Sequence, residues 1–241
     1  MTSGARQTAL DSTSTPETGP AGSPRDAVAR RDPGHDSRVL DPLLDIAGLN
    51  TALAEAVCLG SAFDPDGRTL CLELEVLRLP ETRSGVTADG RDGRVRLTLR
   101  GVGRVAASLR AQRWNHVDAD ILPLTPDTID QAIKSFGGGR LHGWEFVDVD
   151  DSGWSLWREL LSFDAVLDPE RPGAHVFEFS QEEGVDPREL DVRVWFDELS
   201  VQDATGAEIS AAHFVADGRR WWAAHDAGDP RAVRPGIAPP L

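Results

Sequence analysis

The chain has 241 residues and a formal net charge of −15 at pH 7, because 40 acidic side chains outnumber 25 basic ones. A surface of this sign repels polyanions, which argues against nucleic-acid binding and favours a basic protein as partner. No stretch approaches the roughly 18 apolar residues of a membrane-spanning helix, and no apolar segment near the N-terminus could serve as a secretory signal. We therefore expect a cytoplasmic protein that binds neither nucleic acid nor membrane.

The basic residues and the cysteines fit a bacterial protein encoded by a GC-rich genome. Lys134 is the only lysine, so the abundance of arginine reflects codon usage more than phosphate binding. Cys58 and Cys71 are the only cysteines. In a reducing compartment we expect both to remain free thiols.

The first predicted elements follow a polar N-terminal segment. Residues 1–40 are rich in Ser, Thr, Pro, Gly and charge and lack apolar periodicity, so they are predicted to be a disordered tail. Residues 41–231 are expected to form a single globular domain, and residues 232–241 a flexible C-terminal tail. A helix is predicted to start at Asp41–Pro42, and a hairpin to turn at Asp64–Gly67.

Two segments, residues 69–77 and 94–110, alternate apolar and polar side chains with a period of two. This pattern predicts strands of a sheet with one dry and one wet face, and such sheets are usually antiparallel. If the two strands are neighbours, the glutamate row of the first and the arginine row of the second pair on the wet face. A bend or bulge is expected at Gly101 and Gly103.

Further strands and short helices are predicted in the second half, and no internal repeat is visible. The strands are expected over residues 114–121 and 141–149, around 175–179 and around 192–196. The helices are expected to start at Thr125–Pro126, to run over 154–161, and to lie between Ser210 and Ala227 with a break or kink near Asp217–Gly218. This order predicts an α+β fold, with a mainly antiparallel twisted β-sheet or sandwich and three to four short helices.

The segment Gly101–Ala106 matches the G-x-G-x-x-A pattern of dinucleotide-binding loops, with Asp118 and Asp120 placed downstream. In that motif the glycines let a pyrophosphate approach the N-terminus of a helix. The apolar alternation continues through the motif to Leu109, however, where a helix would have to begin. A bent strand is the preferred interpretation and nucleotide binding is an alternative.

A candidate metal site follows the strand predicted over residues 141–149. Its ligands would stand at positions one, three, five and twelve of a calcium-binding loop: Asp148, Asp150, Ser152 and Glu159. Ser155 occupies a position where such a loop has an apolar residue, and a helix N-cap at Asp151 or Ser152 explains the same residues without metal. We expect no cofactor, with calcium or another divalent cation as the alternative.

His116, Asp118 and Asp120 alternate along a predicted strand and would point to one side. An imidazole and two carboxylates in a row could hold a divalent ion or share acid and base roles. The solvated face of a half-buried strand gives the same pattern, and that is the preferred interpretation.

A cluster of aromatic and basic residues near the C-terminus is the candidate partner-binding surface. Adjacent tryptophans on a helix point about 100° apart, so both are buried only if the helix is covered on two sides. Tryptophan and arginine also dominate binding hot spots. The candidate residues are Arg219, Arg220, Trp221, Trp222 and His225. Packing within the core of the protein is the preferred interpretation of this cluster, and partner binding is the alternative.

These observations favour a non-catalytic, cytoplasmic binding protein with a protein partner, which is expected to be basic. An acidic inhibitor of a basic toxin, of the bacterial immunity type, is one concrete form. The alternative is a metal-dependent hydrolase that uses the Asp148–Asp150 segment or the His116 row. A nucleotide-binding domain at Gly101 is a further alternative.

Overall fold

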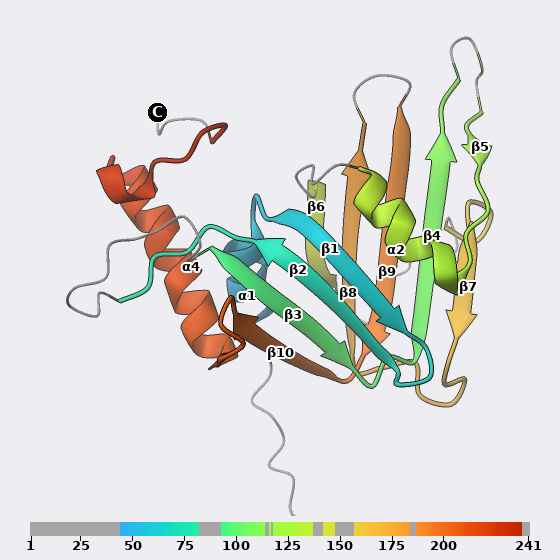
Figure 1. Cartoon of the computed structure of the whole chain (residues 1–241), viewed down its shortest axis with the longest axis horizontal. Coiled ribbons are helices and arrows are strands. Elements are labelled where there is room, and N and C mark those ends of the chain that lie inside the picture. The colour runs from blue at the N-terminus through green and yellow to red at the C-terminus, as the bar shows by residue number, and fades with distance from the viewer. Residues whose placement is uncertain are drawn as a thin grey trace, which may run out of the picture. The chain divides into compact units, whose positions relative to one another are not determined.

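The computed structural model describes residues 44–81, 93–113, 116, 118–136, 142–147, 157–183 and 187–237. They belong to one compact unit that begins at Pro42. Its helices are α1 (Ile46–Leu53), α2 (Pro126–Ser135), α4 (Ala211–Asp226) and the short 3-10 helix η1 (Pro230–Ala232). Antiparallel strands in two sheets make up the rest, so the predicted α+β class is confirmed (Figure 1).

Each sheet is built from strands of both halves of the chain. The first sheet has the order β1-β2-β3-β10-β11, with β1 Val57–Asp64, β2 Thr69–Glu75, β3 Arg94–Arg100, β10 Glu198–Asp203 and β11 Glu208–Ile209. The second sheet has the order β5-β4-β9-β8-β6, with β5 Asp120–Ile121, β4 Arg104–Ala111, β9 Arg188–Phe196, β8 His175–Glu182 and β6 His142–Val147. Strand β7 (Phe163–Val166) pairs with the free side of β4.

The sheets share strands that turn a corner and run on from one sheet into the other. β3 continues into β4 through Gly101 and Gly103, as the sequence predicted, and β9 continues into β10 through Asp197. Gly101 has a φ of 63°, which a residue with a side chain adopts at a cost. A Cβ on Gly103 would lie 2.2 Å from the carbonyl oxygen of Pro172. Both glycines are therefore needed for the corner itself.

One hydrophobic core fills the space between the two sheets. The inward residues of the first sheet include Leu72 and Leu97, and those of the second include Phe177 and Val194; all four have 0 % exposure. This is the dry face that the alternation in residues 69–77 and 94–110 predicted. The strands of the first sheet cross those of the second obliquely (Figure 1).

The fold contains an internal repeat that the sequence did not reveal. In the first sheet β2 pairs with β3 so that Glu73 faces Arg96, and in the second sheet β8 pairs with β9 so that Glu178 faces Arg193. Each half thus supplies a helix, a three-strand meander and a bent strand that crosses to the other sheet. The repeat is one of topology and of charge pattern, which is why it becomes visible in the structure and not in the sequence.

The helices of the two halves exchange places. α1 precedes β1 but packs against β6, whereas α2 precedes β6 but packs against β1. The fifth residue of each helix binds the edge strand that the helix covers: the N–H of Phe146 donates to Asn50 Oδ1 at 3.0 Å, and the N–H of Phe63 donates to Asp130 at 3.2 Å. Edge strands are prone to pair with other chains, and these contacts cover them.

The C-terminal helix is continuous, so the predicted break near Asp217–Gly218 was wrong. Gly218 is buried where α4 crosses α1, and a Cβ there would lie 2.6 Å from the Cα of Ala52. The glycine therefore serves a close helix contact. Beyond the helix, η1 buries Ala232 against Trp221, and Arg234 pairs with Glu75, so part of the segment predicted as a tail packs on the domain.

Two other predicted elements differ in extent. Asp45 caps α1, which begins at Ile46, so the helix does not extend back to Asp41–Pro42. Of the strand predicted over residues 114–121, the described part is strand only at Asp120 and Ile121. Of the helix predicted over residues 154–161, residues 154–156 lie outside the described residues, and residues 158–161 are turn and irregular structure, so the prediction was wrong for that part.

Candidate functional site

The outer face of the first sheet is exposed and forms the leading candidate site. Because side chains alternate along a strand, the residues between the core positions of β2, β3 and β10 share this face. Arg94, Arg96, Arg100, Glu73 and Glu198 are all exposed there. We call this surface the open face.

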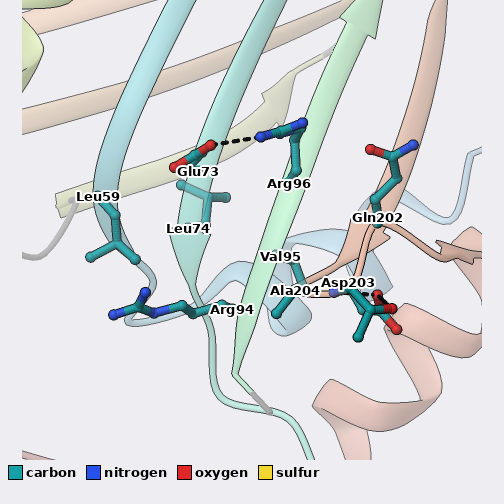
Figure 2. Close-up of a pocket in the computed structure, with 11 residues that line it drawn as sticks. Leu59, Glu73, Leu74, Arg94, Val95, Arg96, Gln202, Asp203 and Ala204 are labelled. Carbon is teal, nitrogen blue, oxygen red and sulfur yellow. Dashed lines mark hydrogen bonds and ion pairs between the residues drawn. The ribbon is translucent and has the colours of Figure 1, made fainter. Parts of the chain in front are cut away.

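A groove of about 630 Å³ lies at one end of the open face. It is bordered by Leu59 of β1, by Arg94 and Arg96 of β3, by Glu73 of β2 and by the turn that follows Gln202. Figure 2 shows Arg94 extending from β3 across β2 toward Leu59. The groove therefore combines an apolar side chain with two guanidinium groups.

Two features of the groove leave groups available to a ligand. Leu59 is the extra residue of a bulge in β1 and is 39 % exposed, although it is apolar. Arg96 pairs with Glu73 at 2.8 Å, as the sequence predicted for neighbouring strands, whereas Arg94 forms no ion pair with any described residue. Among the described residues, the side chain of Arg100 bonds only the hydroxyl of Ser200, at 2.9 Å.

The outer face of the second sheet, by contrast, is covered. Ala106, Val176 and Trp195 are buried there, and Leu161 packs against them. Arg193 pairs with Glu178, and its guanidinium lies 5.2 Å from the ring of Trp157 and 5.7 Å from that of Trp195. We call this surface the covered face.

The arginines of β4 have structural partners on the covered face. Arg104 donates two hydrogen bonds, of 2.8 and 2.7 Å, to Asp164 of β7. Arg110 contacts Asp191 at 2.6 Å and Glu189 at 2.7 Å. Burial raises the pKa of the Asp191 carboxyl, and the charge of Arg110 opposes that rise. The arginine row is thus paired in β4 and largely exposed in β3.

The predicted partner-binding cluster is mostly engaged within the protein. Trp221 is 5 % exposed and packs on Leu77 and Ala232, while the indole N–H of Trp222 donates to the carbonyl of Thr51 at 3.1 Å. The helix is therefore covered on two sides, which is how two adjacent tryptophans are both shielded. His225 stacks on Trp221 with ring centroids 5.2 Å apart.

The two arginines of this cluster also have internal partners. Arg219 contacts Asp45 at 2.9 Å. Arg220 bonds the carbonyl of Leu79 and the carboxylates of Asp217 and Glu81. Asp217 in turn accepts from Arg78, which ties the helix to the segment after β2. These contacts give the cluster a structural role in holding α4.

The glycine motif does not form a dinucleotide-binding loop. An antiparallel strand, β4, begins at Arg104, directly after Gly103, where the motif requires a helix. Arg68 donates to the carbonyl of Val102 at 3.0 Å, so the backbone of the motif is bound within the corner. The bent-strand interpretation is confirmed.

The remaining candidates are only partly described. Asp148, Asp150 and Ser152 lie outside the described residues, and Glu159 is exposed in a turn. His116 and Asp118 are exposed outside any strand, and Asp120 pairs with Arg113 at 2.5 Å. The structure therefore does not place His116, Asp118 and Asp120 in a row along one strand.

The chain has no significant match among protein-family models, curated proteins or solved structures. Among the described residues no helix is long and apolar enough to cross a membrane.

The groove residues were not singled out from the sequence. The glutamate and arginine rows were recognised, but only as a cross-strand pairing. The free guanidinium of Arg94 depends on Glu75 binding Arg234 from beyond the C-terminal helix, and this contact has no local signal. The exposure of Leu59 follows from a bulge, which the alternation of β1 alone does not locate.

Proposed function

We propose that the protein is a non-catalytic, cytoplasmic binding protein that engages a basic protein partner. An acidic inhibitor of a basic toxin, of the immunity type, is the form that the proposal favours. The argument rests on how the charged side chains of the described residues are distributed between internal pairs and the surface.

The observation that carries this proposal is that most described arginines are used in ion pairs within the chain. In these pairs the charge of each arginine is neutralised by a carboxylate of the same chain, and the carboxylates in excess face water. The pairs include Arg68–Asp168, Arg78–Asp217, Arg104–Asp164, Arg110–Asp191, Arg113–Asp120, Arg219–Asp45 and Arg231–Asp229.

Several exposed carboxylates have no basic partner among the described residues. They lie on turns, on a helix start and at strand ends, which are places that a partner can reach. These residues are Asp64, Asp66, Asp127, Glu170, Glu182 and Glu198. With a net charge of −15, such a surface accelerates encounter with a basic protein and disfavours acidic ones.

The proposal is tested by affinity capture followed by a purified binding measurement. The full chain is immobilised and exposed to an extract of its native host at low salt, and the partner is then expressed and titrated. We expect a basic protein whose affinity falls about tenfold or more when salt rises from about 50 to 500 mM, because screening weakens contacts between exposed charges. A neutral or acidic partner, or an affinity that does not respond to salt, would overturn the proposal.

A further inference from the structure

We propose that the open face of the first sheet docks a segment of a partner protein that stacks an aromatic side chain on Arg96 and gives a carboxylate to Arg94. The inference rests on the proposed function in requiring a protein partner. It does not depend on the net charge of that partner, since a basic protein can carry one carboxylate at this point.

The first step of the argument is the internal repeat. Glu73 faces Arg96 across β2 and β3 in the same way that Glu178 faces Arg193 across β8 and β9. The side chain of Arg96 is 53 % exposed and that of Arg193 is 4 % exposed. The repeat therefore places the same type of ion pair on an exposed surface in the first sheet and on a covered surface in the second sheet.

The covered copy shows which chemistry fits such a surface. Residues after β6 bring an aromatic ring over the guanidinium of Arg193, from Trp157, and an apolar contact to the sheet, from Leu161. The same segment then gives the carboxylate of Asp164 to Arg104. An aromatic ring, an apolar side chain and a carboxylate together cover this face.

Among the described residues, a covering segment of this kind lies over the second sheet and not over the first. β6 and β8 are separated by residues 148–174, which include the covering segment. β1 and β2, their counterparts in the first half, are joined by the tight turn at Asp64–Gly67. No described segment of the chain lies over Arg96.

The side chains beside Arg96 are smaller than those beside Arg193. Thr98 stands two residues along β3 from Arg96, at the position that Trp195 holds relative to Arg193 in β9. Cys71 faces Thr98 across the strands, where the covered face has Val176 beside Trp195. Thr98 and Cys71 carry no ring that stacks on Arg96, and the exposed guanidinium can take an aromatic ring from a partner instead, a contact that favours Arg over Lys.

The charge of Arg94 indicates the second group that the bound segment should carry. Glu75 lies opposite Arg94 but is bound to Arg234, so Arg94 has no carboxylate among the described residues. Its guanidinium points along a groove of about 630 Å³ beside the exposed Leu59 (Figure 2). A carboxylate that enters this groove pairs with Arg94 through charge-assisted hydrogen bonds, while an apolar neighbour contacts Leu59.

The test uses a synthetic peptide with the sequence of residues 157–166, which contains Trp157, Leu161 and Asp164. The peptide is titrated into the isotope-labelled full chain, and amide signals are followed by NMR. We expect signals of β2, β3 and β10 to shift. Arg96→Gln and Arg94→Gln should each weaken binding about threefold or more.

Matched variants separate the proposed contacts from general charge effects. Arg171→Gln removes the same charge from an exposed arginine elsewhere, and it should change the affinity less than about twofold. Arg96→Lys keeps the charge but not the planar group, and should weaken binding nearly as much as Arg96→Gln. Peptides with Trp157→Ala or Asp164→Asn should each bind more weakly than the parent peptide.

The other outcomes would overturn the inference. Shifts confined to β7, β8 and β9 would mean that the peptide only replaces the chain's own segment. Shifts of the open face that depend on protein concentration without peptide would make the occupant a second copy of this chain. If a basic partner is captured and Arg96→Gln leaves its affinity unchanged, the proposed docking face is wrong while the proposed function stands. If the peptide binds the open face as expected but no basic partner exists, the docking face stands and the proposed function is wrong.

Discussion

Arg96 and Arg193 occupy equivalent register positions in the two sheets, yet Arg193 is buried beneath Trp157 and Arg96 is open to water. The same pair of residue types therefore has two energetic roles in one molecule. An exposed cross-strand ion pair contributes little to stability, whereas removing a buried guanidinium loses both its packing and its ion pair in a place that water reaches poorly.

This difference predicts unequal costs for the same substitution. Arg96→Ala should leave the free energy of unfolding nearly unchanged, because both side chains of its ion pair are exposed. Arg193→Ala should lower the free energy of unfolding by about 2 to 4 kcal/mol, because its buried guanidinium packs beside Trp157 and Trp195 and pairs with the partly buried Glu178. Urea unfolding of both variants measures the two values. Equal costs would contradict the assignment of an open and a covered face.

The exchanged helices predict a second pair of effects. Asp130 accepts a hydrogen bond from the hydroxyl of Ser61 at 2.8 Å and another from the N–H of Phe63 at 3.2 Å. Asp130→Ala leaves both donors without this acceptor and should cost about 1 to 3 kcal/mol. Gln131→Ala, at the exposed neighbouring position, should stay within about 0.5 kcal/mol. A small effect of Asp130→Ala would mean that water replaces the carboxylate at this edge.

The sequence allowed the class of the fold to be predicted but not its internal symmetry. The alternation through Val95, Leu97 and Leu99 records burial on one side, which is a local property of a strand. The equivalence of Glu73–Arg96 and Glu178–Arg193 is a relation between residues about a hundred positions apart, and it became visible only through the register of the strands.

The surroundings of the candidate residues could not be predicted from the sequence as well as the fold could, and for a physical reason. Tryptophan and arginine are typical of binding surfaces as well as of cores, and the two neighbouring segments that cover the helix around Arg220, Trp221 and Trp222 are seen only in the structure. Arg94 lies on the predicted wet face of its strand, where charged residues are common, so the sequence gives no reason to single it out. Whether a charge has a partner depends on contacts over long sequence distances.

The close contact between α4 and α1 gives a third prediction. Gly218→Ala replaces a poor helix former with a good one, which by itself would stabilise the helix by about 1 kcal/mol. The new Cβ would lie 2.6 Å from the Cα of Ala52, however, so backbone must move. We expect a net loss of about 1 to 3 kcal/mol in thermal or urea unfolding. Ala223→Gly, at an exposed position of the same helix, measures the propensity effect alone, and a more stable Gly218→Ala variant would show that the helices do not approach this closely.

The buried thiol of Cys58 gives a prediction for alkaline pH. Burial raises the pKa of this thiol from its ordinary value of 9.0 to about 11. Between these values the unfolded chain releases the proton while the folded chain retains it. Unfolding is therefore favoured as pH rises, and the stability due to this group should fall by about 2 to 3 kcal/mol between pH 9 and 11.

The thiol variants isolate this effect from other groups that titrate in the same range. Cys58→Ala removes the group, so its stability should decline less steeply above pH 9 than that of the unsubstituted chain, whatever the cost of the substitution itself. Cys71→Ala should keep the full slope, because it leaves the Cys58 thiol in place. If Cys58→Ala and the unsubstituted chain lose stability in parallel up to pH 11, the thiol is hydrated in the folded state and β1 packs less tightly against the core than the structure has it.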